Sequence, residues 1–237
     1  MPRTARTLVA GGHYHLINRG NNRGTVFSSR ADYDSFVRLI EQAQSRIGLS
    51  LLAVCLMPNH FHLVVAQDRA NDISRWMHWL LTTFSTRHHG LHGSCGRLWQ
   101  GRFKAFPIEQ DNHLLTVMRY VERNALRAGL VSKAEDWDWG SLAWRDKAEG
   151  CLLSLPPMTL PRDWRVRVNS VQSAQELSAL RECVNRQRPF GNDAWVRETA
   201  SSLGLEFSTR RPGRPPTKPS RPHGNSASRV RPRRHGN

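Results

Sequence analysis

Residues 49–66 predict a β-hairpin, and this hairpin restricts the possible folds more than any other stretch of the chain. An apolar run ends at Leu56, a Pro-Asn turn follows, and a second run of β-forming residues returns. Strand side chains alternate between two faces, so His60 and His62 point the same way while Phe61 points into the opposite layer. The chain is therefore expected to form an antiparallel sheet that presents two imidazoles on one face.

Helices and strands alternate around this hairpin. Their order, β-α-β-β-α-β-α, predicts an α+β fold, a ferredoxin-like antiparallel sheet with helices on one face. The second helix is expected to start near Ile73 and to end within His88-His89-Gly90. The expected strands cover residues 13–18, 49–56, 60–66 and 98–108, and the first and third helices cover residues 29–47 and 112–127.

The distribution of apolar and charged residues divides the chain into three regions. Residues 1–131 are expected to form the main domain, and residues 132–207 a C-terminal helical extension. Residues 208–237 are rich in Arg, Pro, Gly and Ser and are expected to form a disordered basic tail.

The chain is strongly basic, with a formal net charge of +16. Nine positive charges lie in the tail, which contains no acidic residue, so residues 1–207 still carry a net charge of +7. A polyanionic partner is expected, with arginine as the main group that meets phosphates; a basic solvated surface or a ribosome-associated protein is the alternative. No apolar run is long enough for a membrane span, and the four widely spaced cysteines fit a reducing cytoplasm.

The third helix carries a second group of reactive side chains. Tyr120 and Asn124 are one turn apart and therefore share a face. Together with His60 and His62 they could surround one Mg²⁺ or Mn²⁺ ion that leaves positions open for a phosphate oxygen. The phenol would then attack the phosphate and form a covalent phosphotyrosine, with His113 or a metal-bound water as proton acceptor. An ordinary tyrosine at the edge of the core is the alternative.

The faces of this helix follow from a rotation of 100° per residue. The side chains of Arg119 and Arg123 are expected to face away from the core. The buried stripe is expected to contain Leu114, Met118, Val121 and Ala125, and its flank His113, Val117, Tyr120, Asn124 and Arg127. A phenol, a carboxamide and a guanidinium are thus expected at the boundary between core and solvent.

Cationic side chains lie beside these elements. The turn-rich loop after the first strand contains Arg19, Asn21 and Arg23 and suits close approach to a phosphate backbone or base edges, although a polar hairpin turn is an equally good interpretation. The fourth strand is expected to present Arg102 and Lys104. We expect these side chains to contact nucleic acid.

A second His-x-His sequence occurs at His13-Tyr14-His15. His-x-His alone is a weak indication of a metal site, and no partner residues flank this copy. It is therefore expected to be structural, or to support the other pair through His15.

Several segments together resemble the HUH single-tyrosine transposases of the insertion-sequence type. They are MPNHFHLV at 57–64, RYVERNALRAGLV at 119–131, HLINRGNNR at 15–23 and LWQGRFK at 98–104. The PFGN…W stretch at 189–195 and the RRPGRP stretch at 210–215 resemble a bacterial subgroup, the REP-associated tyrosine transposases.

This resemblance implies an enzyme that cuts and rejoins single-stranded DNA. It implies that His60, His62 and Asn124 bind the divalent metal and that Tyr120 is the nucleophile. Imperfect palindromic hairpins would be the substrate, contacted by the loop after the first strand and by Arg127. Ala125 stands where the family commonly has proline, and alanine is expected to let the helix continue without a break.

The sequence as a whole predicts a metal-dependent endonuclease and strand transferase of the bacterial cytoplasm, associated with the nucleoid, with residues 1–131 as its catalytic domain. A non-catalytic architectural or regulatory protein that binds hairpin DNA is one alternative. A plasmid-type relaxase or replication initiator is another. The choice between monomer and homodimer, and between an active site within one chain and one shared by two, is left open.

Overall fold

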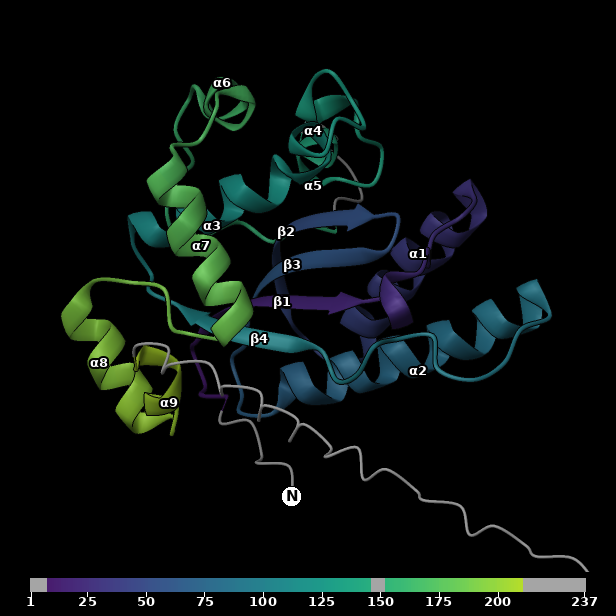
Figure 1. Ribbon diagram of the computed structural model, residues 1–237, viewed down its shortest axis with the longest axis horizontal. Coiled ribbons are helices and arrows are strands. Elements are labelled where there is room, and N and C mark those ends of the chain that lie inside the picture. Colours follow the sequence, from purple (N-terminus) through teal and green to yellow (C-terminus); the bar gives the residue numbers. More distant parts are fainter. Residues whose placement is uncertain (1–7, 146–151, 211–237) are drawn as a thin grey trace, which may run out of the picture.

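The computed structural model describes residues 8–145 and 152–210, and it is built on a four-stranded antiparallel sheet (Figure 1). The strand order is β2-β3-β1-β4, which is the ferredoxin-like order, so the expected α+β class is confirmed. The strands are β1 (His13–Arg19), β2 (Ser50–Met57), β3 (His60–Ala66) and β4 (Lys104–Ile108). The fourth strand is shorter than expected. Within residues 98–103, only Trp99 forms a β-bridge, and it pairs with Gly20, the residue that follows β1.

Two helices cover one face of the sheet. Helix α1 (Arg30–Arg46) begins at a capping box in which Ser29 and Asp32 bind each other's backbone N–H groups. Helix α2 (Asp72–His92) is longer than expected. It continues through the His-His-Gly stretch and ends at Gly93, whose φ of 57° is the left-handed conformation that suits a helix C-terminus.

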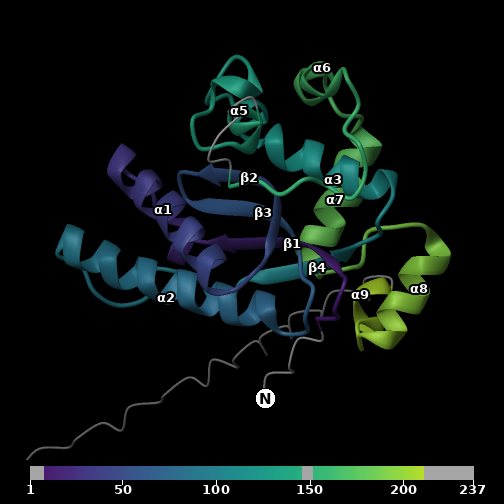
Figure 2. The same cartoon turned by 180° about the vertical axis from the view of Figure 1, so that it is seen from behind.

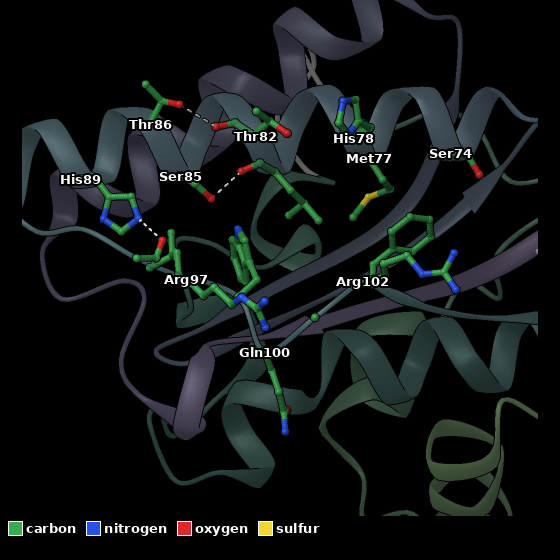
Figure 3. Close-up of a pocket in the computed structure, with 16 residues that line it drawn as sticks. Ser74, Met77, His78, Thr82, Ser85, Thr86, His89, Arg97, Gln100 and Arg102 are labelled. Atoms are coloured by element: carbon green, nitrogen blue, oxygen red, sulfur yellow. Dashed lines mark hydrogen bonds between the residues drawn. The ribbon is translucent and has the colours of Figure 1, made fainter. Parts of the chain in front are cut away.

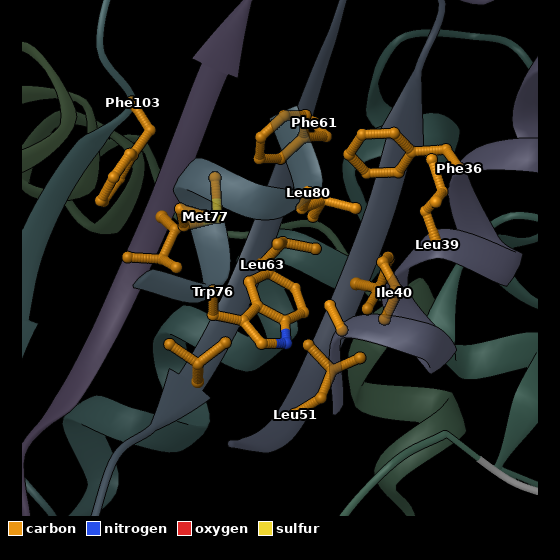
Figure 4. Packing of buried hydrophobic residues seen from close by; sticks show 14 of the residues in the cluster. Phe36, Leu39, Ile40, Leu51, Phe61, Leu63, Trp76, Met77, Leu80 and Phe103 are labelled. Carbon is orange, nitrogen blue, oxygen red and sulfur yellow. The ribbon is translucent and has the colours of Figure 1, made fainter. Parts of the chain in front are cut away.

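The opposite face of the sheet is covered by α3 (Asn112–Glu122), so the helices are not confined to one face as the sequence suggested. Alternate strand residues feed two separate cores: Leu16 and Leu63 pack with α1 and α2, whereas Ile17 and Val64 pack with α3. Figures 1 and 2 show α1 and α2 on the side of the sheet opposite α3, and Figure 4 shows the α1–α2 core. The second core places the tyrosine helix directly over the histidine strand.

The expected continuous helix is interrupted at Arg123. The backbone N–H of Arg123 contacts both the Arg119 and Val121 carbonyls, and a short helix, α4 (Asn124–Arg127), resumes after it. Alanine after Asn124 is therefore not sufficient to keep the helix regular. The expected buried stripe is found: the side chains of Leu114, Met118, Val121 and Ala125 are all fully buried.

The extension folds back on α3 and on the edge of the sheet. Arg119 and Arg123 do not face solvent freely; their guanidinium groups donate to backbone carbonyls of residues 167–171. Phe190 exchanges backbone hydrogen bonds with the chain around β4. The helical elements are η2 (Ala134–Asp136), α5 (Ser141–Trp144), α6 (Trp164–Asn169), α7 (Ala174–Arg186), α8 (Asp193–Ser202) and α9 (Glu206–Thr209).

The C-terminal boundary of the extension differs slightly from the expected one. Helix α9 ends at Thr209, two residues beyond the expected limit at 207. The rest of the expected tail, residues 211–237, lies outside the described residues. Among the helices of the described segments, none combines the length and apolar character that a bilayer span requires.

Candidate active site

The two histidines of β3 lie side by side at the start of that strand. Their ring centroids are 5.0 Å apart, and the register pairs His60 with Arg19 and His62 with Ile17 of β1. The side chain of His62 is buried, whereas that of His60 is half-buried. The two histidines are two residues apart, so their side chains lie on the same face of the sheet.

Each ring is held through its Nδ1 atom. His60 Nδ1 lies 2.6 Å from the side-chain oxygen of Asn59, and His62 Nδ1 lies 2.9 Å from Nε2 of His15. When Nδ1 carries the proton in such a contact, Nε2 carries the lone pair, as in histidines that bind metals. The second His-x-His sequence therefore supports the first through His15, which is one of the two roles expected for it.

Tyr120 stands over these rings. Its ring centroid lies 5.9 Å from that of His62 and 6.1 Å from that of His15. The guanidinium carbon of Arg127 lies 4.2 Å from the tyrosine ring centroid, and Nη2 of Arg127 donates to Oδ1 of Asn124 at 2.6 Å. Tyr120 therefore lies against His62, the neighbour of His60, and Arg127 contacts both the Tyr120 ring and the Asn124 amide oxygen after the end of α3.

His113 is not part of this group. Its Nδ1 atom contacts both carboxylate oxygens of Asp111, at 2.8 and 3.0 Å. It also lies seven residues before Tyr120, which is about 10 Å along the helix axis. His113, one of the two proton acceptors considered for the Tyr120 phenol, is thus held at the opposite end of α3 from the phenol.

Burial controls the charge of the histidines. Desolvation lowers the pKa of His15 to about 3 and that of His60 to about 4, and it holds the pKa of His62 well below its ordinary value. The positive charges of Arg19 and Arg127 lower the pKa values of His60 and His62 further. The three imidazoles are therefore neutral at pH 7, which is the form that binds a metal.

These pKa values predict a loss of stability in mild acid. A buried histidine with a pKa of about 3 binds fewer protons than the same residue in the unfolded chain, where its pKa is 6.5. Its contribution is present in full above pH 6.5 and is lost as the pH falls toward 3, at up to about 1.4 kcal/mol per unit. Free energies of unfolding in urea between pH 7 and pH 4 should show a smaller slope in His15→Gln, and an unchanged slope in His78→Gln, whose side chain is exposed. Equal slopes in wild type and His15→Gln would contradict the prediction.

The expected DNA-binding loop borders the histidines. Asn21–Arg23 forms a 3₁₀ turn with exposed side chains, and Asn22 and Arg23 have φ values of 52° and 59°. Gly20 precedes the turn, where a Cβ would meet the Gly24 carbonyl oxygen at 2.3 Å, so only glycine fits there. The Asn59 side chain donates to the Arg23 carbonyl at 3.0 Å, and this contact joins the loop to the turn that presents His60.

The two cations expected on the fourth strand lie in different surroundings. Lys104 pairs with Ile17 on the neighbouring strand, and Ile17 pairs with His62 on the next. The side chain of Lys104 is therefore on the same face of the sheet as that of His62, with the two backbones two strand spacings, about 10 Å, apart. Arg102 lies outside the strand and lines a cavity of about 710 Å³ between α2 and residues 96–103 (Figure 3). The same cavity is lined by Arg97, Trp99 and other residues of both segments.

Sequence reasoning did not identify Glu122 as a residue that holds the site in place. This carboxylate is 1% exposed and ends α3, two residues before Asn124. It accepts hydrogen bonds from the Ser141 hydroxyl, the Arg145 guanidinium and the Trp164 indole N–H, all at 2.7–2.8 Å. A charged residue on the buried side of an amphipathic helix was the only sequence signal, and its partners lie 19 to 42 residues away.

Comparison with known proteins assigns the class. The family model described as "Transposase IS200 like" matches residues 8–124, which include the whole sheet and α3. Residues 8–124 are thus similar to the IS200-like transposases, and the expected class of enzyme, a transposase that cleaves and joins single-stranded DNA, is confirmed.

Within this class, the expected similarity to REP-associated tyrosine transposases is also found. A Haemophilus influenzae protein provisionally named as one is 25% identical over 146 residues, which are 56% of this chain and 77% of the relative. A solved structure, described as a REP-associated tyrosine transposase bound to a REP hairpin, superimposes with a TM-score of 0.52 and 19% identity. The match covers 73% of this chain and 93% of that one, and it shows a shared fold.

Proposed function

We propose that this transposase is a metal-dependent endonuclease and strand transferase for hairpin DNA, with residues 1–131 as its catalytic domain. The observation that carries the proposal is that a buried phenol lies against one of two neighbouring neutral imidazoles, and that Arg127 links its ring to the carboxamide of Asn124. These are the groups that bond exchange at a phosphate would need: a nucleophile and ligands for a divalent cation.

His60, His62 and Asn124 would hold the metal, Mg²⁺ or Mn²⁺. Both histidines are fixed through Nδ1, which leaves Nε2 for a ligand bond, and both are neutral at pH 7. The amide nitrogen of Asn124 is buried and has no hydrogen-bond partner among the described residues, so the amide is not fully engaged by the protein. When bound, the cation would withdraw charge from the scissile phosphate and fix its orientation.

Tyr120 would supply the nucleophile. Its oxygen would bond to phosphorus while the bond from phosphorus to the leaving ribose oxygen breaks, and the phenol proton would end on that oxygen. One phosphodiester is exchanged for another, so the energy of the bond is retained for rejoining strands without ATP. The guanidinium carbon of Arg127 lies 4.2 Å from the centroid of the tyrosine ring, so its positive charge would lie beside the reacting groups.

DNA would lie across the basic side of this site. Arg19 pairs with His60 in the sheet, and Asn21 and Arg23 follow it in the adjacent turn. Lys104 lies on the same face of the sheet as His62. The cavity with Arg102 offers aromatic and cationic groups for an unpaired base, as in other single-strand binding sites. The solved relative bound to a REP hairpin supports a hairpin substrate here as well.

Arg127 is expected to compete with the metal for Asn124. Its guanidinium occupies the amide oxygen at 2.6 Å and adds a positive charge beside both histidines. In a Tyr120→Phe background, Arg127→Leu should therefore tighten Mn²⁺ binding about tenfold, which corresponds to about 1.4 kcal/mol. Isothermal titration calorimetry measures this. Arg30→Leu removes the same charge far from the site and should change nothing; weaker Mn²⁺ binding in Arg127→Leu would show that Arg127 supports the metal site.

The proposal is tested with labelled single-stranded hairpin DNA, the purified protein and Mn²⁺. Cleavage together with an adduct that survives denaturant, both lost in EDTA, is the expected result. Tight binding with neither cleavage nor adduct, on hairpins of several sequences, would instead favour a non-catalytic protein that binds hairpin DNA.

A further inference from the structure

A second group of metal-binding side chains lies on the other face of the sheet. Asp32 is in the first turn of α1, and His88 and His92 are in the last turns of α2. One ligand atom from each of the three lies within 4.8 Å of the others. None of these residues takes part in the candidate active site.

The geometry of this group resembles a built site. His88 and His92 are one helical turn apart, so both rings project from the same side of α2, and their centroids are 4.3 Å apart. Nε2 of His92 lies 2.8 Å from Oδ1 of Asp32, a contact that joins the two helices. Two imidazoles at i and i+4 on one helix are a common way to present ligands to zinc.

The Asp32 carboxylate is held rigidly. Its Oδ2 atom accepts hydrogen bonds from the backbone N–H groups and the hydroxyls of Ser28 and Ser29 at 2.9–3.0 Å. The side chain is 2% exposed. The other oxygen, Oδ1, faces His92. Hydrogen bonds to one carboxylate oxygen orient the other toward a metal in the same way in known metal sites.

The pKa values of Asp32 and His88 are shifted in the directions that favour metal binding at neutral pH. Burial alone would raise the pKa of Asp32, but hydrogen bonds from His92, Ser28 and Ser29 outweigh it and lower the pKa to about 2. Burial and the neighbouring His92 lower the pKa of His88. Nδ1 of His88 is buried and has no hydrogen-bond partner within the described segments, so one nitrogen of a neutral imidazole is available as a ligand.

We propose that Asp32, His88 and His92 bind a zinc ion that joins the start of α1 to the end of α2. Two imidazole nitrogens and one carboxylate oxygen are a common zinc ligand set, with solvent in the fourth position, whereas Mg²⁺ prefers oxygen ligands. The ion would replace the hydrogen bond between His92 and Asp32 with a stronger link. Its role is structural: it fixes the two helices that back the sheet, and it does not depend on the proposed catalytic function.

The test uses the untagged full-length chain with His60→Ala and His62→Ala, so that the histidine pair of the proposed active site cannot hold zinc. One equivalent of Zn²⁺ should remain after dialysis, by elemental analysis, and the melting temperature should rise by several degrees on adding Zn²⁺ but not Mg²⁺. Co²⁺ should give the visible absorption of a site with nitrogen ligands. Adding His88→Gln and His92→Gln to that variant should weaken Zn²⁺ binding at least 100-fold and remove the thermal shift.

His89→Gln is the matched control. It lies on the same turn of α2, but its ring contacts Ser94 and the Gly96 carbonyl, so zinc binding should be unchanged. Unchanged zinc stoichiometry after substitution of His88 and His92 would overturn the proposal. So would the complete absence of bound zinc from the His60→Ala, His62→Ala protein.

Discussion

Tyr120→Phe is expected to eliminate the covalent DNA adduct and to lower the rate of strand cleavage on the order of 10⁴-fold or more. The substitution removes a single oxygen from a ring that lies against His15, His62 and Arg127. The ring itself, 5% exposed, keeps its packing, so hairpin binding and the melting temperature should change little. The measurement is denaturing electrophoresis of a labelled hairpin after incubation with Mn²⁺.

The other two tyrosines provide the comparison. Tyr33 lies on the opposite face of the sheet, stacked on Phe27 and Trp139, and Tyr33→Phe should leave the adduct and the cleavage rate unchanged. An adduct that persists in Tyr120→Phe and disappears in Tyr33→Phe or Tyr14→Phe would assign the nucleophile elsewhere. The proposed role of Tyr120 would then be wrong.

Glu122→Ala is expected to cost roughly 3–5 kcal/mol of unfolding free energy. The substitution leaves a partly buried guanidinium, a buried hydroxyl and a buried indole N–H without the carboxylate that accepts their hydrogen bonds, and each such loss is expensive at a buried position. A typical domain is stable by only 5–15 kcal/mol, so this is a large fraction of the total. Urea unfolding followed by circular dichroism measures the change.

Glu182→Ala is the matched control for this effect. Glu182 also pairs with arginines, Arg186 and Arg188, but its side chain is 45% exposed. Exposed ion pairs contribute about 0–1 kcal/mol, so the control should lose little stability. A loss in Glu122→Ala no larger than in Glu182→Ala would show that the three buried donors find other acceptors.

Local periodicity was sufficient to predict the antiparallel sheet and the shared face of two histidines. Alternation in a strand placed His60 and His62 on one face, whereas regular helical spacing between Tyr120 and Asn124 is broken at Arg123. Contacts between distant segments could not be predicted in this way. His15 meets His62 across two strands, 47 residues apart, and nothing in either local pattern specifies the register that pairs them.

Elements differed from expectation where tertiary contacts outweigh local preference. Helix α2 continues past Gly90 because its apolar side remains packed on the sheet up to Phe84 and its end is joined to Asp32 through His92. Helix α3 is interrupted at Arg123, whose guanidinium is held by backbone carbonyls of α6. Propensity is a weak guide at such positions, since packing determines where a helix ends.

The position of Tyr120 against His62 of its own chain leads to an expectation about how copies of the protein cooperate. The proposed nucleophile lies against a proposed metal ligand of the same polypeptide, so we expect that a mixture of Tyr120→Phe and His62→Ala proteins will not recover cleavage, even at high concentration. Each copy would then cut one strand independently. Joining two DNA ends would require two complete subunits to meet on the DNA, and not an exchange of helices between them.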